Sequence, residues 1–211
     1  MCSVRPDLAG HPDRLRWNAR YGDGFVASFA AHPIAVRALS SPLPAGPVLD
    51  LASGPSGSAL LAAAGAGRQV TAVDASEVAL RLLGAEASRR GLTELITLIH
   101  ADLQVWQPEP GSYALVLCTG YWDRAVFATA AAAVAPDGLL GWEAFTIAAR
   151  RERPSLPAQW CLNPGEPAVL LPADFAVLDQ RELPDSQTST KRQLLARRLA
   201  APGDDLQASG Q

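Results

Sequence analysis

The chain has 211 residues, of which 48% are hydrophobic and 18% are charged, a balance typical of one packed globular domain rather than of a disordered chain. Its formal net charge of −3 leaves no general excess of Lys and Arg, so we expect no nucleic-acid partner, because binding to phosphates depends on such an excess. No apolar run is long enough to cross a bilayer, and residues 1–7 lack the apolar core of a signal peptide. We therefore expect a cytoplasmic protein that does not bind membranes.

Three cysteines, Cys2, Cys118 and Cys161, stand at unrelated spacings. This pattern favours free thiols over a disulfide framework or a zinc site, and we predict no metal site. The sequence leaves the oligomeric state open between a monomer and a homodimer.

Residues 1–46 are expected to form a helical segment and a linker. Aromatic side chains recur every fourth residue from Trp17 to Phe29, which is helical spacing and predicts one or two helices over residues 12–40. Three prolines in residues 41–47 remove backbone donors and fix φ, so the helix cannot continue there.

Strands and helices alternate from residue 47 onward. Strands are predicted at residues 48–52, 69–73, 95–100, 113–118 and 139–145, and helices at residues 58–64, 76–90 and 123–135. Because such units pair their strands in parallel through right-handed crossovers, we expect a single, doubly wound, Rossmann-like α/β domain over residues 47–200.

The end of the chain follows a different pattern. Two β-like runs at residues 175–183 and 190–199 are joined by a turn at residues 184–187, so we expect an antiparallel hairpin at the edge of a mostly parallel, seven-stranded sheet. Residues 201–211 have little to bury and are predicted to be a disordered tail.

Three acidic residues stand where predicted strands end. Asp50 precedes a loop of small residues that contains Gly54, Asp74 follows that glycine by twenty positions, and Asp102 follows the third strand. Because the carboxyl ends of parallel strands meet at one edge of the sheet, we expect these carboxylates to face one crevice. Acidic groups at the ends of apolar strands are costly unless they are paired or bound to a ligand, so the pattern predicts a binding site.

The order of these residues distinguishes between ligands. In a dinucleotide fold the glycines follow the strand directly, whereas Asp50 stands four residues before Gly54, where it can meet an ammonium group such as that of S-adenosylmethionine. The spacing of Asp74 is typical of a residue that accepts hydrogen bonds from ribose hydroxyls, and Asp102 offers an acceptor for an adenine amino group. A nicotinamide-dependent reductase is the weaker alternative.

At these residues the chain resembles class I S-adenosylmethionine-dependent methyltransferases and, within them, the TehB-like (tellurite-resistance) group of small enzymes. The similarity spans residues 15–199 and includes the runs Trp17-Asn18-Ala19-Arg20-Tyr21 and Val134-Ala135-Pro136-Asp137-Gly138. It implies that residues 1–46 cover a cofactor site, that residues 47–200 form the methyltransferase core, and that Arg20 pairs with the cofactor carboxylate. The residues implied in cofactor binding are Trp17, Arg20, Tyr21, Asp50, Ala52, Ser53, Gly54, Asp74, Ala75, Asp102, Leu103, Cys118 and Thr119.

The loop after the first strand departs from the pattern of this family. Ala52 and Ser56 stand where glycines are typical, which predicts a tighter loop. The same two residues suggest the alternative function, a catalytically degenerate methyltransferase-fold protein that binds the nucleotide or a partner without transferring a methyl group.

The position of further residues near the predicted crevice makes them candidates on the acceptor side. Those predicted to bind substrate are Tyr121, Trp122, Trp142, Phe145, Trp160 and Asn163, and the catalytic candidates are Tyr121, Asp123, Arg124 and Glu143. The alternatives are that Asp123 caps a helix, that Trp142 packs in the core, and that residues 154–167 form a solvent loop rather than a lid.

The expected reaction is an in-line displacement, which mainly requires orientation of the reacting groups. A thiolate, selenolate or metalloid anion needs no base, whereas a hydroxyl acceptor does. The sequence therefore predicts an enzyme acting on a small molecule and leaves its acceptor open among S, Se or Te nucleophiles and a hydroxyl or amine of a metabolite.

Overall fold

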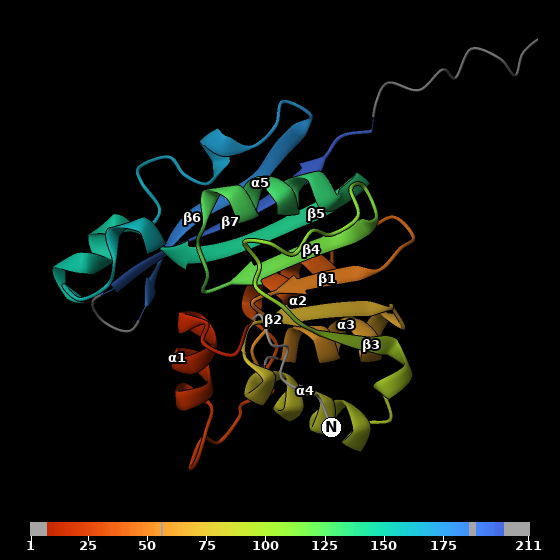
Figure 1. The fold of residues 1–211 in the computed structure, drawn as a ribbon. Helices are drawn as coiled ribbons and strands as arrows, with labels where there is room; N and C mark the ends of the chain where they lie inside the picture. The colour runs from red at the N-terminus through yellow and green to blue at the C-terminus, as the bar shows by residue number, and fades with distance from the viewer. Residues whose placement is uncertain (1–7, 56, 186–188, 201–211) are drawn as a thin grey trace, which may run out of the picture.

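The computed structural model describes residues 8–55, 57–185 and 189–200, and in it seven strands form one sheet (Figure 1). The strands are β1 (Val48–Leu51), β2 (Val70–Asp74), β3 (Ile96–His100), β4 (Tyr113–Thr119), β5 (Val134–Phe145), β6 (Phe175–Asp185) and β7 (Ser189–Arg198). Their order is β3-β2-β1-β4-β5-β7-β6. The first five strands pair in parallel, and β7 pairs antiparallel with both β5 and β6.

This architecture confirms the predicted α/β class, the mostly parallel sheet and the antiparallel hairpin. The strands lie within a few residues of their predicted positions, because short apolar runs bounded by Gly, Pro and polar residues have few alternatives. The predicted tail at residues 201–211 and the turn residues 186–187 lie outside the described residues.

Helices cover both faces of the sheet. They are α1 (Pro12–Arg20), α2 (Pro33–Leu39), α3 (Gly57–Ala66), α4 (Glu77–Arg89) and α5 (Arg124–Ala133), with short 3-10 turns at Thr93–Leu95, Ile147–Arg151, Ala158–Trp160 and Ala168–Leu170. Residues of α2, α3 and α4 share one buried apolar cluster, and α5 contributes to another cluster together with Trp122 and Trp142. The sheet is therefore covered on opposite faces by different helices, as in a doubly wound fold.

In the N-terminal segment, the helices cover less of the chain than the spacing of the aromatic residues suggests. Helices α1 and α2 agree with the prediction of one or two helices over residues 12–40, but residues 21–32 between them are not helical, so the fourfold spacing of aromatic residues continues beyond the end of α1. Gly24 adopts a φ of +79° in the turn that follows the helix, and Phe25 packs edge-on against Tyr21 at a centroid distance of 5.1 Å. The aromatic residues thus form a cluster rather than a helical stripe.

Strand β5 begins five residues earlier than predicted. Val134 pairs with Tyr113, and the register then shifts before Leu115 pairs with Leu139. Asp137 has a φ of +61° within this irregular stretch. Pro136 and Gly138 are residues typical of turns, but they lie within β5. The register shift accommodates them along the sheet.

Strand β1 pairs with β2 on one side and with β4 on the other. From β1 the chain first adds strands on one side of the sheet, β2 and β3, and then crosses to the other side to add β4 and β5. Ligands of open α/β sheets bind beyond the carboxyl ends of the strands at such a switch point. Helix α1 lies beyond this same edge of the sheet in Figure 1. The fold therefore places the N-terminal helix against the loops that follow β1, β2 and β4.

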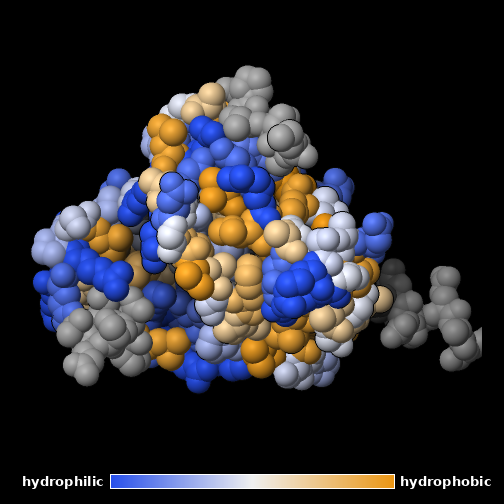
Figure 2. Space-filling view, turned by 90° about the horizontal axis from the view of Figure 1, so that it is seen from below, coloured by the Kyte–Doolittle hydropathy of each residue, from blue (hydrophilic) through white to orange (hydrophobic). Residues whose placement is uncertain are grey.

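On the face seen in Figure 2, hydrophilic and hydrophobic residues alternate in small groups. Large exposed apolar side chains such as Val26, Val105 and Val169 come from different segments of the chain. Within the described part of the chain, no helix combines the length and the apolar content needed to cross a membrane.

Candidate functional site

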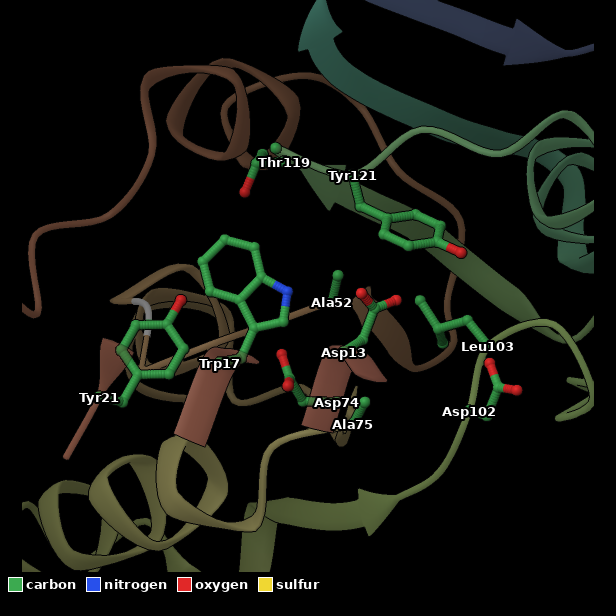
Figure 3. Close-up of a pocket in the computed structure, with 11 residues that line it drawn as sticks. Asp13, Trp17, Tyr21, Ala52, Asp74, Ala75, Asp102, Leu103, Thr119 and Tyr121 are labelled. Atoms are coloured by element: carbon green, nitrogen blue, oxygen red, sulfur yellow. The ribbon is translucent and has the colours of Figure 1, made fainter. Parts of the chain in front are cut away.

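A cavity of about 120 Å³, here termed the first cavity, opens at the carboxyl ends of β1 to β4 (Figure 3). It is lined by Asp13, Trp17, Tyr21, Ala52, Asp74, Ala75, Asp102, Leu103, Thr119, Gly120 and Tyr121. These residues come from α1 and from the ends of four strands, so the tertiary structure brings together most of the residues that the sequence predicted to bind a cofactor.

Asp74 connects the loops that follow β1 and β2. One carboxylate oxygen accepts the backbone N–H of Gly54 at 2.8 Å, and the other accepts that of Ser76 at 2.7 Å. Burial raises the pKa of Asp74 to about 6, opposing the two N–H bonds that lower it, and the nearby charge of Asp13 raises it further. Among the described residues, the groups that lower this pKa are the two backbone N–H donors, so Asp74 is a buried carboxylate stabilised there by backbone dipoles.

The loop after β1 is covered by the segment that follows α1. A Cβ atom on Gly54 would lie 3.1 Å from the Tyr21 hydroxyl, and one on Gly57 would lie 2.1 Å from the backbone oxygen of Phe29. Ala52 adopts the left-handed region with a φ of +48°, in which a glycine is favoured, and its small side chain still reaches the first cavity.

This cover explains where the remaining residues of the loop lie. Asp50, Ser53 and Gly54 are buried and do not line the first cavity, and Tyr21 lies against Gly54. Ser56 lies outside the described residues. Of the predicted contacts for an amino-acid group, only Ala52 reaches the cavity wall.

Asp102 and Leu103 form the opposite wall of the first cavity. One carboxylate oxygen of Asp102 accepts the backbone N–H of Gln104 at 2.9 Å, and the other lies 3.4 Å from Nε2 of His11. Leu103 is buried and packs in the cluster under α5. An acidic edge and an apolar wall thus stand side by side.

Helix α1 is held over the sheet edge by Glu77, in the first turn of α4. Arg14 contacts this carboxylate with two guanidinium nitrogens, and Asn18 donates to it at 2.9 Å. Burial alone would raise the pKa of Glu77, but the hydrogen bonds from Arg14 and Asn18 hold it at about 2. This docking directs Asp13, Trp17 and Tyr21, which are spaced four residues apart, toward the first cavity.

A second cavity of about 320 Å³ adjoins the first and shares Asp13, Trp17, Gly120 and Tyr121 with it. Its other lining residues are Arg16, Gln104, Trp122, Asp123, Phe145, Leu156, Gln159 and Trp160. The predicted substrate residues Tyr121, Trp122, Phe145 and Trp160 therefore meet in one place, together with the catalytic candidates Tyr121 and Asp123.

Asp123 also has a structural role. Its Oδ1 accepts the backbone N–H groups of Ala125 at 2.8 Å and of Val126 at 3.0 Å, so it caps α5. Burial raises the pKa of the neighbouring Tyr121 hydroxyl well above its usual range, and the charge of Asp123 adds to this rise. The phenol is thus neutral at physiological pH.

Other predicted acceptor-side residues do not line either cavity. Trp142 is fully buried and packs against Phe127, and its indole N–H donates to the backbone oxygen of Tyr121 at 3.0 Å. Arg124 pairs with Glu166 at 2.9 Å, and the backbone N–H of Asn163 donates to the same carboxylate. Trp142 thus lies in the core behind Tyr121, whereas Arg124 and Asn163 are exposed and lie outside the lining of both cavities.

Glu143 lies on a different face of the sheet from Trp142, its neighbour in β5. Its carboxylate is 3.1 Å from Nζ of Lys191 and 3.3 Å from Nε2 of His32, and it accepts a hydrogen bond from Gln193 at 2.6 Å. Glu143 does not line either cavity, because alternation along β5 turns it toward α2 and β7.

Two predicted cofactor residues also lie outside the first cavity. Arg20 is exposed and stacks on the ring of Phe25 at 5.3 Å. Cys118 is fully buried, and this burial raises the pKa of its thiol, followed in effect by the charge of Asp50. Cys118 and Cys161 are both free thiols, whereas Cys2 lies outside the described residues.

The sequence reasoning did not single out Asp13, Arg16, Gln104, Leu156 or Gln159. Asp13 carried a signal, since it precedes Trp17 by one helical turn and therefore shares its face. Leu156 and Gln159 come from the Pro-rich stretch, whose irregular backbone has no periodicity that predicts the direction of its side chains.

Comparison with known proteins agrees with this geometry. Residues 48–138 match the family model of a methyltransferase domain. No curated protein matches the sequence.

Several solved structures have similar folds. The first comes from a study of the conversion of a disulfide bond into a thioacetal group during echinomycin biosynthesis. It is 19% identical, with a TM-score of 0.60, over 81% of this chain and 83% of that chain. Geranyl diphosphate C-methyltransferase from Streptomyces coelicolor A3(2), in complex with S-adenosyl-L-homocysteine, is 11% identical, with a TM-score of 0.64, over 78% of this chain and 74% of that chain. The [4+2]-cyclase SpnF is 14% identical, with a TM-score of 0.64, over 80% of this chain and 79% of that chain. The chain thus has the fold of S-adenosylmethionine-dependent methyltransferases.

Proposed function

We propose that this protein is an S-adenosylmethionine-dependent methyltransferase that acts on a small molecule. The observation that carries the proposal is the first cavity, where Asp74 and Asp102 from neighbouring strands face a space closed by Trp17 of α1. The second cavity adjoins it and offers room for an acceptor. The matched methyltransferase domain and the fold support the same function.

The residues of the first cavity fit the nucleoside part of this cofactor. A carboxylate oxygen has lone pairs for more than one hydrogen bond, so Asp74 can accept ribose hydroxyls in addition to its two backbone donors. Asp102 offers an acceptor for the adenine amino group, while Leu103 and Trp17 provide apolar surface for the ring. Figure 3 shows the Asp74 carboxylate and the Trp17 indole next to the same space.

The amino-acid part of S-adenosylmethionine would meet a different environment from the nucleoside part. The Tyr21 hydroxyl lies against Gly54, and burial raises the pKa of this phenol to about 12, so it remains protonated. Binding at Gly54 therefore requires Tyr21 to rotate away from the loop. Where Tyr21 stays in place, its hydroxyl is the polar group that the amino-acid part meets.

The cofactor supplies a methyl group on a positively charged sulfur. The chain's own residues hold the two reactants close and exclude water, and Gly120 and Tyr121 form the wall that both cavities share. Tyr121 is not a general base near neutral pH because its pKa is raised by burial. Orientation, rather than proton abstraction by this phenol, is the contribution that these residues make.

Calorimetric titration with S-adenosylmethionine, S-adenosylhomocysteine and NADH tests the proposal. We expect both sulfur nucleosides to bind and NADH to give no heat of binding. Binding of NADH without a response to either sulfur nucleoside would contradict the proposed cofactor.

A catalytically degenerate methyltransferase-fold protein is the second candidate. It is favoured by Ala52 in a left-handed conformation, by the close cover of the loop at Gly57, and by a cyclase that shares the fold. Binding of S-adenosylhomocysteine without methyl transfer to any acceptor in a broad panel would favour this candidate.

The finer assignments belong to the same proposal. The run from Trp17 to Tyr21 supports membership of the TehB-like group, and the net charge of −3 supports a cytoplasmic protein without nucleic-acid or membrane partners. We leave monomer and homodimer as equal alternatives.

A further inference from the structure

The region where the two cavities meet is acidic. Asp13, Asp74 and Asp102 line the first cavity, and none of the described residues that line it is basic. Asp13 and Asp123 line the second cavity, where Arg16 is the basic lining residue. A group that enters this region therefore experiences a negative potential, which favours cations and opposes anions.

Asp13 differs from the other carboxylates in its hydrogen bonding. Asp74, Asp102 and Asp123 each accept at least one backbone N–H, as described above. No described residue donates a hydrogen bond to Asp13 or forms an ion pair with it, and its charge raises the pKa values of Asp74 and Tyr121. Its acceptor capacity is available to a ligand.

Asp13 lies where the two cavities meet, between the proposed places of the cofactor and the acceptor. It lines both cavities, and Figure 3 shows its carboxylate next to Trp17 and near the ring of Tyr121. Arg16 does not line the first cavity, and its guanidinium stacks on Trp160 at 4.5 Å. The second cavity thus has an acidic inner end and an aromatic side wall formed by Trp160 and Phe145.

We propose, on the basis of the proposed methyl transfer, that the acceptor is a small amine on a flat apolar body, with its nitrogen beside Asp13. Of the acceptors that the sequence left open, thiolate, selenolate and metalloid anions would approach the carboxylates of Asp13 and Asp123. The cations near the second cavity are stacked on its aromatic wall, with Arg16 on Trp160 and with Arg153 and Lys191 on Phe145. Aromatic walls and a carboxylate together are suited to an amino group on an aromatic or similar scaffold.

The chemistry of the transfer explains why a carboxylate is useful at this point. The amine binds as an ammonium and first gives up one proton to water, which frees its lone pair. The neutral amine then uses this lone pair to form the new C–N bond while the C–S bond breaks, and the electron pair of that bond stays on sulfur. Positive charge thereby moves from sulfur to nitrogen, and the methylated ammonium then loses a proton to water. Asp13 on the acceptor side stabilises this developing charge, which an anionic acceptor would not produce.

Three ligands with the same aromatic body test the inference: 2-phenylethylamine, 2-phenylethanol and 2-phenylethanethiol. Their dissociation constants are measured calorimetrically with protein saturated with S-adenosylhomocysteine. We expect the amine to bind at least about tenfold more tightly than the alcohol or the thiol, because a hydrogen bond between charged groups is strong. With S-adenosylmethionine, methyl transfer to the amine is expected to exceed transfer to the other two.

The Asp13→Asn variant, also saturated with S-adenosylhomocysteine, should lose this preference. Asp23→Asn is the matched control, since Asp23 is exposed and lines neither cavity. No preference for the amine, no binding of it, or a preference retained in Asp13→Asn would overturn the inference. Failure of S-adenosylhomocysteine to bind would instead contradict the proposed function.

Discussion

Two buried carboxylates, Asp74 and Glu143, have opposite electrostatic environments. Asp74 has a pKa raised to about 6, because burial outweighs the two backbone N–H bonds. Burial also acts on Glu143, but hydrogen bonds from His32 and Gln193 and the charges of His32 and Lys191 hold its pKa at about 2. One carboxylate is compensated by side chains and the other is not.

This difference separates a structural region from a binding region. The corner formed by α2, β5 and β7 contains its own cations, so Glu143 needs nothing from outside the protein. The edge at β2 leaves a buried charge with backbone donors only, an arrangement that costs stability and is typical of a site that binds a ligand. We therefore expect Glu143, a catalytic candidate by sequence, to contribute to the stability of the corner formed by α2, β5 and β7.

The largest expected effect comes from removing the compensated charge. Glu143→Gln should lower the free energy of unfolding at pH 7 by about 3 kcal/mol, since a buried ion pair loses one partner. Because the folded-state pKa lies below the ordinary value of 4.5, the stabilisation is present above that value and is lost as the pH falls from 4.5 toward 2. Urea unfolding at pH 7 and pH 3 measures both effects.

Glu109→Gln is the control for this variant, because Glu109 is exposed and its replacement should change stability by less than about 0.5 kcal/mol. A loss at pH 7 no larger than that of the control would show that the corner does not depend on Glu143.

Removing the uncompensated carboxylate should act on binding. Asp74→Ala is expected to weaken binding of S-adenosylhomocysteine by about 1–3 kcal/mol, because the ribose hydroxyls lose their acceptor. Calorimetry compares this variant with Asp23→Ala, which changes an exposed residue outside both cavities. An unchanged dissociation constant in Asp74→Ala would mean that the ribose is held elsewhere.

The smallest expected effect is the pH dependence of this binding. If the ionised form of Asp74 binds the ribose, affinity should fall about tenfold between pH 7 and pH 5, since its pKa is about 6. Stability moves in the other direction, because the raised pKa means that ionised Asp74 destabilises the fold above pH 6 and that this cost is relieved as the pH falls from 6 to 3.8.

Titrations at several pH values measure the affinity, and the Asp74→Ala variant should show no step near pH 6. A flat profile in the unaltered protein would contradict the link between Asp74 and binding. Glu143 does not change its charge in this range because its pKa is about 2, so the two carboxylates remain distinguishable.

Much of the fold was predictable from local sequence. Apolar runs such as residues 48–52 and 113–118 lie between turn residues, and their order with the helices specifies parallel pairing. The departures came where local signals conflict, as in residues 21–32, where the aromatic spacing continues although the helix has ended, and at Asp137, which lies within an irregular part of β5.

The candidate site was predictable where residues follow strand ends. Ala52, Asp74, Asp102 and Thr119 line the first cavity because parallel strands end at one edge. Asp50 and Gly54 follow the same rule, yet both are buried outside the cavity lining. Tyr21 covers Gly54, and a contact between residues so far apart in the chain has no local sequence signal.

The sequence by itself determined which strands exist, that they run in parallel, and that acidic residues stand at their carboxyl ends, because these features depend on periodicity and chain order. Only the tertiary structure decided which carboxylates are compensated. Lys191 reaches Glu143 from β7, whereas Asp13 is brought beside Asp74 by the docking of α1 on Glu77. Electrostatic environment depends on distance in space, and distance in space between remote segments is set by packing rather than by any local pattern.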